Sequence, residues 1–230
     1  MPPSSSNEHA ATAEKIQVLK NTAIGTNDSR GYLVSKRIID IVCATIGLIL
    51  LSPLFLIVTL LIKLEDKKGP VIFKQIRVGK DGKEFYMYKF RSMVANAEEL
   101  KAQLMEKNEA TGPVFKMKND PRVTKIGKFI RKTSIDELPQ LINVLKGEMS
   151  LVGPRPALPS EVSQYTSYEM QRLSVAPGLT CYWQVSGRST IGFDEWVELD
   201  LKYISERSIY LDLKLIIKTV LVLFGSKDAY

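Results

Sequence analysis

Two adjacent carboxylates, Asp136 and Glu137, follow the most basic stretch of the sequence. Residues 116–132 include seven lysines and arginines and a single acid, Asp120. These cations should keep a nearby carboxylate ionised and should let a polyphosphate approach it. An ionised carboxylate can act as a nucleophile that forms an acyl phosphate, and the adjacent glutamate could help to hold Mg²⁺. The pair is therefore a candidate for chemistry on a diphosphate.

The same residues also fit a purely structural interpretation. Ser134 and Glu137 have the spacing of a capping box, and acids in the first turn of a helix are common because they favour its dipole. Pro139 is tolerated only in an opening turn, so both acids must stand at the helix start, where unpaired N–H groups attract anions. The spacing alone leaves both interpretations open.

Further cations occur beside glycine, proline or aromatic residues. Arginine in such rigid loops is well suited to bidentate contact with phosphate. A single surface arginine is ordinary, but the recurrence of these loops favours phosphate binding. The candidate phosphate ligands are Lys89 and Arg91 in KFRSM, Arg155 in GPRP and Arg188 in QVSGRS.

Composition narrows the class of protein. The 230 residues carry a formal net charge of +7, which predicts an anionic partner such as lipid head groups, nucleic acid or phosphorylated small molecules. Cys43 and Cys181 are the only cysteines, so a disulfide framework or a thiolate metal cluster is not available. His9 is the only histidine and lies in a polar tail, which argues against a Ser-His-Asp triad or a histidine zinc site.

An apolar run over residues 38–62 is long enough to cross a bilayer, yet Ser52 and Pro53 stand at its centre. Proline removes a helix hydrogen bond and predicts a kink, and Ser52 can satisfy a freed carbonyl. Basic residues flank both ends of the run, which favours a re-entrant helix with both ends on the cytoplasmic side. An ordinary kinked transmembrane helix is the alternative that these residues leave open.

The remaining pattern predicts an α+β fold that is mostly helical. Residues 71–78 and 83–90 should form a β-hairpin around a Lys-Asp-Gly turn. The apolar segment 211–224 contains two lysines and should be an amphipathic helix in the membrane interface, or else a core helix. Further helices are expected near residues 95–107, 136–146, 161–174 and 193–206. We expect three parts: a flexible tail over 1–33, the membrane helix over 34–64 and a cytoplasmic catalytic domain over 65–230.

Several segments, taken in order, resemble the bacterial sugar transferases, which are monotopic phosphoglycosyl transferases acting on polyprenyl phosphate. The resemblance covers residues 34–230. It rests on the basic entry to the Ser-Pro helix, KFRSM, RKTSIDELPQL, SLVGPRP, PGLTCYWQVSGRS and the ending LDLK…SKDAY. Cys181 and Tyr182 depart from the small or apolar residues usual in relatives, which puts details of that loop in doubt.

The resemblance implies a mechanism. Asp136 corresponds to an aspartate that attacks the β-phosphate of a UDP-sugar, releases UMP and retains the phosphosugar until undecaprenyl phosphate accepts it. Glu137 corresponds to the glutamate associated with Mg²⁺, and Arg131 to a phosphate-binding arginine. Polar residues near the family's site correspond to Lys89, Arg155, Arg188 and Asp212.

The resemblance also implies the biological setting. It favours the re-entrant form of the helix and a catalytic domain on the cytoplasmic face of the bacterial inner membrane. The expected reaction transfers glucose-1-phosphate or galactose-1-phosphate in the first membrane step of exopolysaccharide, capsule or O-antigen assembly. Because only a short polar segment precedes the helix, the chain resembles a minimal catalytic form, and a homodimer is plausible. The alternative is a non-enzymatic adaptor that binds anionic lipid, and a nucleic-acid partner is not expected.

Overall fold

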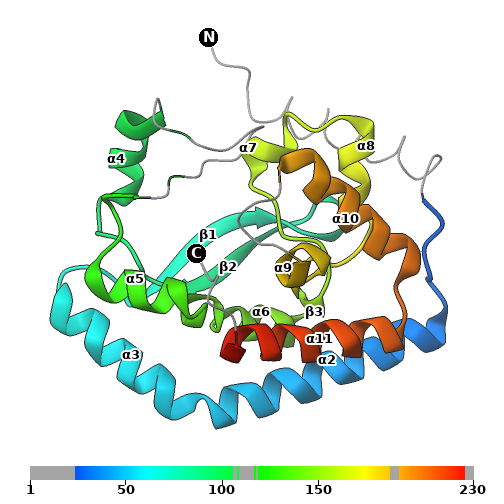
Figure 1. The fold of residues 1–230 in the computed structure, drawn as a ribbon, viewed down its shortest axis with the longest axis horizontal. Coiled ribbons are helices and arrows are strands. Elements are labelled where there is room, and N and C mark those ends of the chain that lie inside the picture. The colour runs from blue at the N-terminus through cyan, green and yellow to red at the C-terminus, as the bar shows by residue number, and fades with distance from the viewer. Residues whose placement is uncertain (1–23, 106–107, 109–116, 118, 187–191, 226–230) are drawn as a thin grey trace.

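The computed structural model describes residues 24–105, 108, 117, 119–186 and 192–225. These residues form a mostly helical α+β fold with one small antiparallel hairpin, as the sequence predicts (Figure 1). The α-helices are α2 (Arg30–Leu50), α3 (Ser52–Glu65), α4 (Ala97–Leu104), α5 (Lys125–Lys132), α6 (Gln140–Lys146), α7 (Pro159–Val162), α8 (Ser167–Met170), α9 (Tyr182–Ser186), α10 (Phe193–Glu206) and α11 (Ile209–Gly225). The strands are β1 (Ile72–Val78), β2 (Glu84–Phe90), β3 (Ser150–Val152) and β4 (Gly178–Thr180), and the 3₁₀ turns are η1 (Lys80–Gly82), η3 (Ile135–Glu137) and η4 (Gln171–Ser174).

Helices α2 and α3 form a shallow V along one side of the molecule (Figure 1). Their axes differ by 59°, so the expected kink at Ser52 and Pro53 is present. Ser52 Oγ donates a 2.8 Å hydrogen bond to the carbonyl of Ile49, and Pro53 stands in the first turn of α3, where its missing N–H leaves no bond unmade. Among the described residues, no single helix has the length and apolar composition to cross a membrane, whereas α2 and α3 together pass that test as a bent pair.

The first helix starts earlier than the expected boundary at residue 34. Helix α2 begins at Arg30, and Ser29 caps it by accepting from the backbone N–H of Tyr32. Residues 30–33 are therefore helical, while residues 1–23 of the expected tail lie outside the described part of the chain.

The expected hairpin is confirmed. Strands β1 and β2 pair antiparallel from Ile72 with Phe90 to Val78 with Glu84. The turn between them places Asp81 and Gly82 at positive φ, a conformation that aspartate tolerates and glycine adopts without strain. The hairpin thus supplies a rigid support for the side chains near residue 89.

A second sheet was not predicted. Strands β3 and β4 pair in parallel, with Ser150 opposite Gly178 and Val152 opposite Thr180. The neighbouring backbones are so close that a Cβ added to Gly178 would lie 2.0 Å from the backbone nitrogen of Gly153. Each strand has only three residues, which is too short to show the alternation of apolar and polar residues that indicates a strand.

Helix α10 spans the predicted residues 193–206, but two other helices are interrupted. Segment 161–174 is divided among α7, α8 and η4: Glu161 accepts from the backbone N–H of Leu158 at the start of α7, and the Thr166 side chain caps α8. The expected helix 136–146 is likewise η3 followed by α6, with Pro139 at the boundary. Capping at Thr166 and the proline at residue 139 therefore divide segments that were each predicted to be one helix.

The core has two parts. The larger cluster joins α2, the hairpin, α6, β3, α10 and α11. The smaller cluster contains Val58 and Ile62 of α3, Phe90 of β2 and Ile130 of α5. The Phe55 and Phe90 rings meet edge to face with centroids 5.1 Å apart. This smaller cluster fixes the end of β2 and the helix before the acidic pair against α3.

Candidate active site

The acidic pair is placed by α5 and a tight turn. Thr124 caps α5 through the backbone N–H of Gly127 at 2.9 Å, and the helix ends at Lys132. Ser134 then adopts a left-handed conformation with φ 55°, and its side chain does not cap η3. The capping-box interpretation is therefore wrong.

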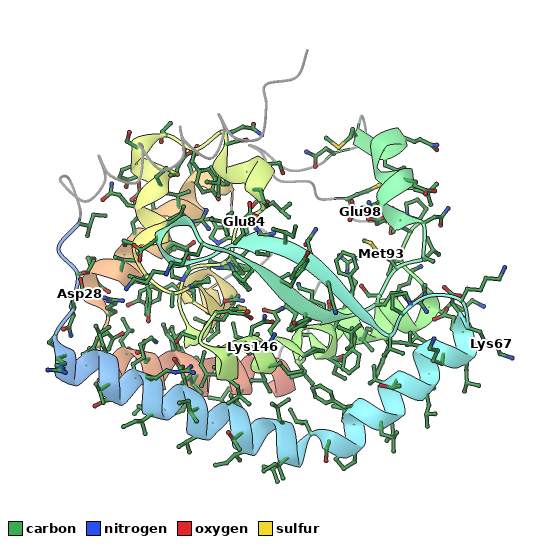
Figure 2. All side chains as sticks on the ribbon, turned by 180° about the vertical axis from the view of Figure 1, so that it is seen from behind. Asp28, Lys67, Glu84, Met93, Glu98 and Lys146 are labelled. Carbon is green, nitrogen blue, oxygen red and sulfur yellow. The ribbon has the colours of Figure 1, made fainter. Side chains whose placement is uncertain are left out.

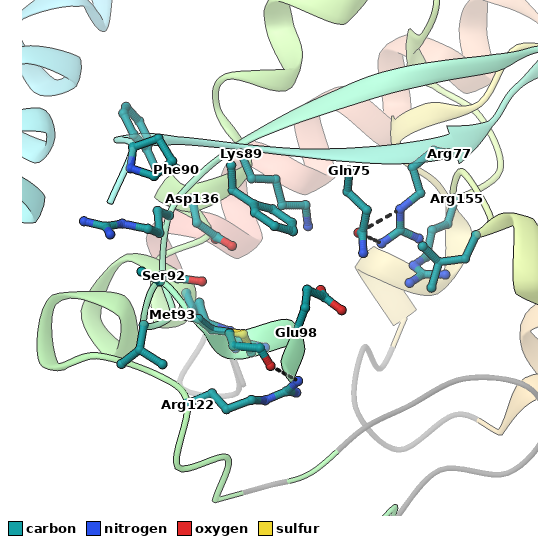
Figure 3. A pocket seen from close by; sticks show the side chains of 18 of the residues that line it. Gln75, Arg77, Lys89, Phe90, Ser92, Met93, Glu98, Arg122, Asp136 and Arg155 are labelled. Carbon is teal, nitrogen blue, oxygen red and sulfur yellow. Dashed lines mark hydrogen bonds between the residues drawn. The ribbon is translucent and has the colours of Figure 1, made fainter. Parts of the chain in front are cut away.

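Asp136 opens onto a cavity of about 340 Å³ between the hairpin, α5 and the loop near residue 155 (Figure 3). Figure 3 shows Asp136 and Lys89 at one end of this cavity and Arg77 and Arg155 at the other. The predicted site residues that line it are Lys89, Arg91, Arg131, Asp136 and Arg155. The cavity therefore joins segments far apart in the sequence.

Burial controls the protonation of Asp136. The residue is 8% exposed, and burial raises its pKa to about 6. Lys89 and Arg131 lower that pKa, while Glu137 raises it. The expected influence of the cations is present but weaker than desolvation. At pH 7 about nine-tenths of this carboxyl is still ionised.

Glu137 is held by Lys89, whose Nζ lies 2.6 Å from Glu137 Oε1. The described residues contain no group of three or more histidine, cysteine or acidic side chains that could hold a metal ion. Mg²⁺, however, usually binds one or two carboxylates together with substrate phosphates. The oxygen donors of Asp136 and Glu137 fit that mode.

Arg91 lines the cavity, but its charge is already paired. Its Nη1 contacts Asp66 Oδ2 at 2.7 Å, and its Nη2 donates to the Asp66 carbonyl at 2.8 Å. Next to Asp66, Glu65 accepts from the backbone N–H groups of Lys125 and Ile126 at 2.8 and 3.0 Å. The end of α3 is thus bonded to β2 and to the start of α5.

Several cavity residues were missed by sequence reasoning. Arg77 is buried and donates to the side-chain oxygen of Gln75 and to the carbonyl of Pro156. Burial, and then the nearby charge of Arg155, lower its pKa to about 9. The buried Glu161 faces Arg155 at 3.3 Å. The sequence shows Arg77 within a strand that alternates inward and outward side chains, but this position alone does not indicate a function.

Of the predicted catalytic and phosphate-binding residues that the structure describes, Glu137 and Asp212 are not among those that line the cavity. Asp212 lies in a separate buried cluster, where Lys36 Nζ is 3.0 Å away and the hydroxyls of Tyr32 and Tyr203 donate to it. It joins α11 to α2 and α10, so its observed contacts are structural. Arg188 lies outside the described residues.

Comparison with known families gives one match that spans most of the sequence. A family model described as bacterial sugar transferase matches residues 31–226. The chain belongs to the bacterial sugar transferase family. The matched range includes all the described residues of the cavity, so the acidic pair and its cations lie within the family domain.

Curated relatives of this sugar transferase support the same assignment. Galactosyl transferase CpsE of Streptococcus agalactiae is 48% identical over 219 residues, which are 93% of this chain and 48% of that protein. The undecaprenyl-phosphate galactose phosphotransferase of Salmonella typhimurium is 44% identical, over 85% of this chain and 41% of its own length. The exopolysaccharide production protein ExoY of Rhizobium meliloti is 38% identical, over 86% of this chain and 88% of its own. The chain thus spans about half the length of the first two.

Proposed function

We propose that this sugar transferase moves a hexose-1-phosphate, from glucose or galactose, from a UDP-sugar to undecaprenyl phosphate. The observation that carries the proposal is a buried, mostly ionised Asp136 at one end of a cavity that also contains Lys89, Arg131, Arg77 and Arg155. A cavity with this charge suits a diphosphate. Relatives named as undecaprenyl-phosphate galactose and glucose transferases support the substrate class.

The reaction has two displacements at one phosphorus atom. An Asp136 oxygen attacks the β-phosphorus, the bond to the bridging oxygen breaks, and UMP leaves with that electron pair. The product is an aspartyl phosphosugar. A phosphate oxygen of the acceptor lipid then attacks the same phosphorus, the acyl phosphate bond breaks, and Asp136 regains its carboxylate. The lipid product is an undecaprenyl diphosphate sugar.

Mg²⁺ is part of the proposal. Glu137, with Asp136 beside it, would hold the ion, which would neutralise charge on the diphosphate. Lys89 orients the Glu137 carboxylate and lowers the pKa of Asp136. Arg131 lines the cavity beside the pair and likewise lowers that pKa.

The outer face of the helical V supports a membrane setting. Exposed apolar side chains project from α2, α3 and α11, and both ends of the V turn back toward the rest of the molecule (Figure 2). At its vertex, Ile49 is 66% and Leu50 is 72% exposed. We infer that the V is re-entrant and that the catalytic cavity faces the cytoplasm at the bacterial inner membrane. A soluble donor and a membrane acceptor would meet there.

Intact-protein mass spectrometry tests the covalent step. The detergent-purified chain is mixed with Mg²⁺ and UDP-glucose or UDP-galactose, without acceptor. We expect a phosphohexose adduct that disappears when undecaprenyl phosphate is added and never forms in Asp136→Asn. Asp194→Asn, a change at an exposed acid on α10, is the matched control and should form the adduct.

Each other outcome changes the proposal in a defined way. Turnover without any adduct would mean direct transfer from donor to acceptor. Lipid binding with neither adduct nor UMP release would favour the non-enzymatic adaptor. An adduct that persists in Asp136→Asn would move the nucleophile to another residue.

A further inference from the structure

The position of Arg155 depends on an aromatic residue outside the cavity. Its guanidinium carbon lies 4.9 Å from the ring centroid of Trp196, within the range of a cation–π contact. Its other neighbour is the Glu161 carboxylate at 3.3 Å. Trp196 belongs to α10 and is absent from the cavity lining. Its contact with Arg155 therefore links α10 to the cavity.

Trp196 is itself packed against the buried Arg172 and the half-buried Trp183. The guanidinium carbon of Arg172 lies 5.6 Å from the Trp196 ring centroid, and the Trp183 ring centroid lies 4.7 Å from it. Arg172 is fixed by a 2.7 Å ion pair with Asp200, which is fully buried. Because Arg172 and Asp200 are buried, the indole packed against Arg172 has little freedom to move.

The charges at the two ends of the cavity differ. Near Asp136, the two acids of the pair are balanced by Lys89 and Arg131. At the other end, Arg77 and Arg155 face the carboxylate of Glu161, whereas Glu98, the remaining acid of the lining, lies near Arg122. This end keeps a net positive charge, so it should attract the phosphate that remains with the nucleotide.

We propose that Trp196 is a positioning residue for the donor: it holds Arg155 where the nucleotide phosphate binds. A free arginine side chain has many rotamers, and binding an anion would cost the entropy of ordering it. Stacking on a fixed indole removes part of that cost before the donor arrives. This inference rests on the proposed function, because it assigns a nucleotide phosphate to this cavity.

Steady-state UMP release tests the inference, with undecaprenyl phosphate, Mg²⁺ and a varied UDP-sugar. Trp196→Leu removes the ring, and we expect KM for the UDP-sugar to rise about three- to tenfold while kcat changes less than about twofold. Trp196→Phe keeps an aromatic face and should restore most of the affinity. In an Arg155→Met background, Trp196→Leu should add no further change, because the stacking partner is already gone.

Val197→Ala is the matched control for stability, because Val197 is a buried neighbour on the same helix. It should lower the melting temperature without raising KM. An unchanged KM in Trp196→Leu would overturn the inference, and so would an equal rise in the Arg155→Met background. If KM for the UDP-sugar rises as much in Val197→Ala as in Trp196→Leu, Trp196 only contributes to packing and the inference is wrong.

Calorimetric titration of UMP into the same variants separates this inference from the proposed function. A wild-type chain that binds UMP but releases none from any UDP-sugar would contradict the transferase proposal alone. The loss of UMP affinity in Trp196→Leu would then still support the positioning role. A wild-type chain that binds no UMP would overturn both.

Discussion

Asp136 is subject to two opposing influences on its pKa. Burial disfavours the charged carboxylate, while Lys89 and Arg131 favour it, and burial has the larger effect. The result is a carboxyl group with a pKa of about 6, still mostly ionised at neutral pH. A buried carboxylate is poorly solvated, which suits a nucleophile in a cavity that must exclude water as a competitor.

This pKa predicts the acid limb of the activity. In the proposed reaction only the ionised carboxylate can attack, so kcat/KM for UMP release should reach half its plateau near pH 6 and fall about tenfold per pH unit below it. An unperturbed aspartate would hold the plateau to about pH 5. The check is a profile of kcat/KM from about pH 4.5 to 8.5, with stability verified at each pH. A flat profile down to pH 5 would contradict the raised pKa.

The same burial predicts that Asp136→Asn is more stable than the wild type at neutral pH. The pKa of Asp136 is higher in the folded state than in the unfolded state. The free energy of unfolding of the wild type therefore falls as the pH rises from about 4 to 6, because the buried carboxyl becomes ionised. Below about pH 4 the carboxyl is protonated in both states and the cost disappears. We expect a gain of about 2 kcal/mol in the free energy of unfolding near pH 7.5. The measurement is denaturant unfolding of both proteins in detergent, once near pH 7.5 and once below about pH 4.

A contrary result would be equally informative. If Asp136→Asn is less stable than the wild type at neutral pH, the carboxylate makes stabilising contacts that outweigh desolvation. The raised pKa would then need another explanation.

At the scale of the elements, the break between α2 and α3 depends on two neighbouring residues. Pro53 takes a position where a missing N–H costs nothing, and Ser52 satisfies the carbonyl of Ile49. The far end of α3 is bonded to the catalytic elements through Glu65 and Asp66. The bend and this anchor together hold α2 and α3 against the cavity.

Cysteine labelling tests the re-entrant arrangement. Arg30 and Lys67 are exposed at the two ends of the V and suit this test better than Lys36, which is paired with Asp212. In a Cys43→Ala background, we expect neither Arg30→Cys nor Lys67→Cys to react with an impermeant reagent in intact cells, and both to react after permeabilisation. Labelling of either position from outside would mean that the helices span the membrane.

The variant Pro53→Ala tests whether Pro53 causes the bend between α2 and α3. It restores a backbone N–H and permits a continuous helix across residues 50–53. We expect a fraction of this variant to show one externally labelled end. If the labelling pattern does not change, Pro53 is not what keeps the helix re-entrant.

At the scale of the whole molecule, the buried cluster around Asp212 joins the long helices to the catalytic part. Asp212 accepts from Lys36, Tyr32 and Tyr203. Lys36 also donates to the carbonyl of Val152 in β3. Four elements, α2, β3, α10 and α11, therefore meet at one ion pair.

Asp212→Asn should damage the fold and leave the chemistry intact. It removes the carboxylate that is ion-paired with the Lys36 ammonium and leaves only the more distant charge of Asp40, at a cost of about 3 kcal/mol in the free energy of unfolding. Because Asp212 does not line the cavity, kcat per folded molecule should be unchanged. Unfolding curves and activity of the folded fraction measure the two effects, with Asp194→Asn as control. If Asp212→Asn loses activity but keeps normal stability, Asp212 has a role in the reaction.

The sequence by itself determined the features that depend on neighbouring residues. The hairpin, α10, the break at Ser52 and Pro53, and the acidic pair at the end of a basic stretch all follow from spacing over a few positions. Turn chemistry, helix period and proline geometry are local, so they can be read without a fold.

Only the tertiary structure decided which of these residues act together. It placed Arg77 and Glu161 in the cavity, stacked Trp196 on Arg155, and put Asp212 in a separate cluster. It also added a raised pKa to the expectation that Asp136 stays ionised, because the cations were visible in the sequence but the burial was not. Burial and charge pairing depend on contacts between distant segments, and those contacts exist only once the chain has folded.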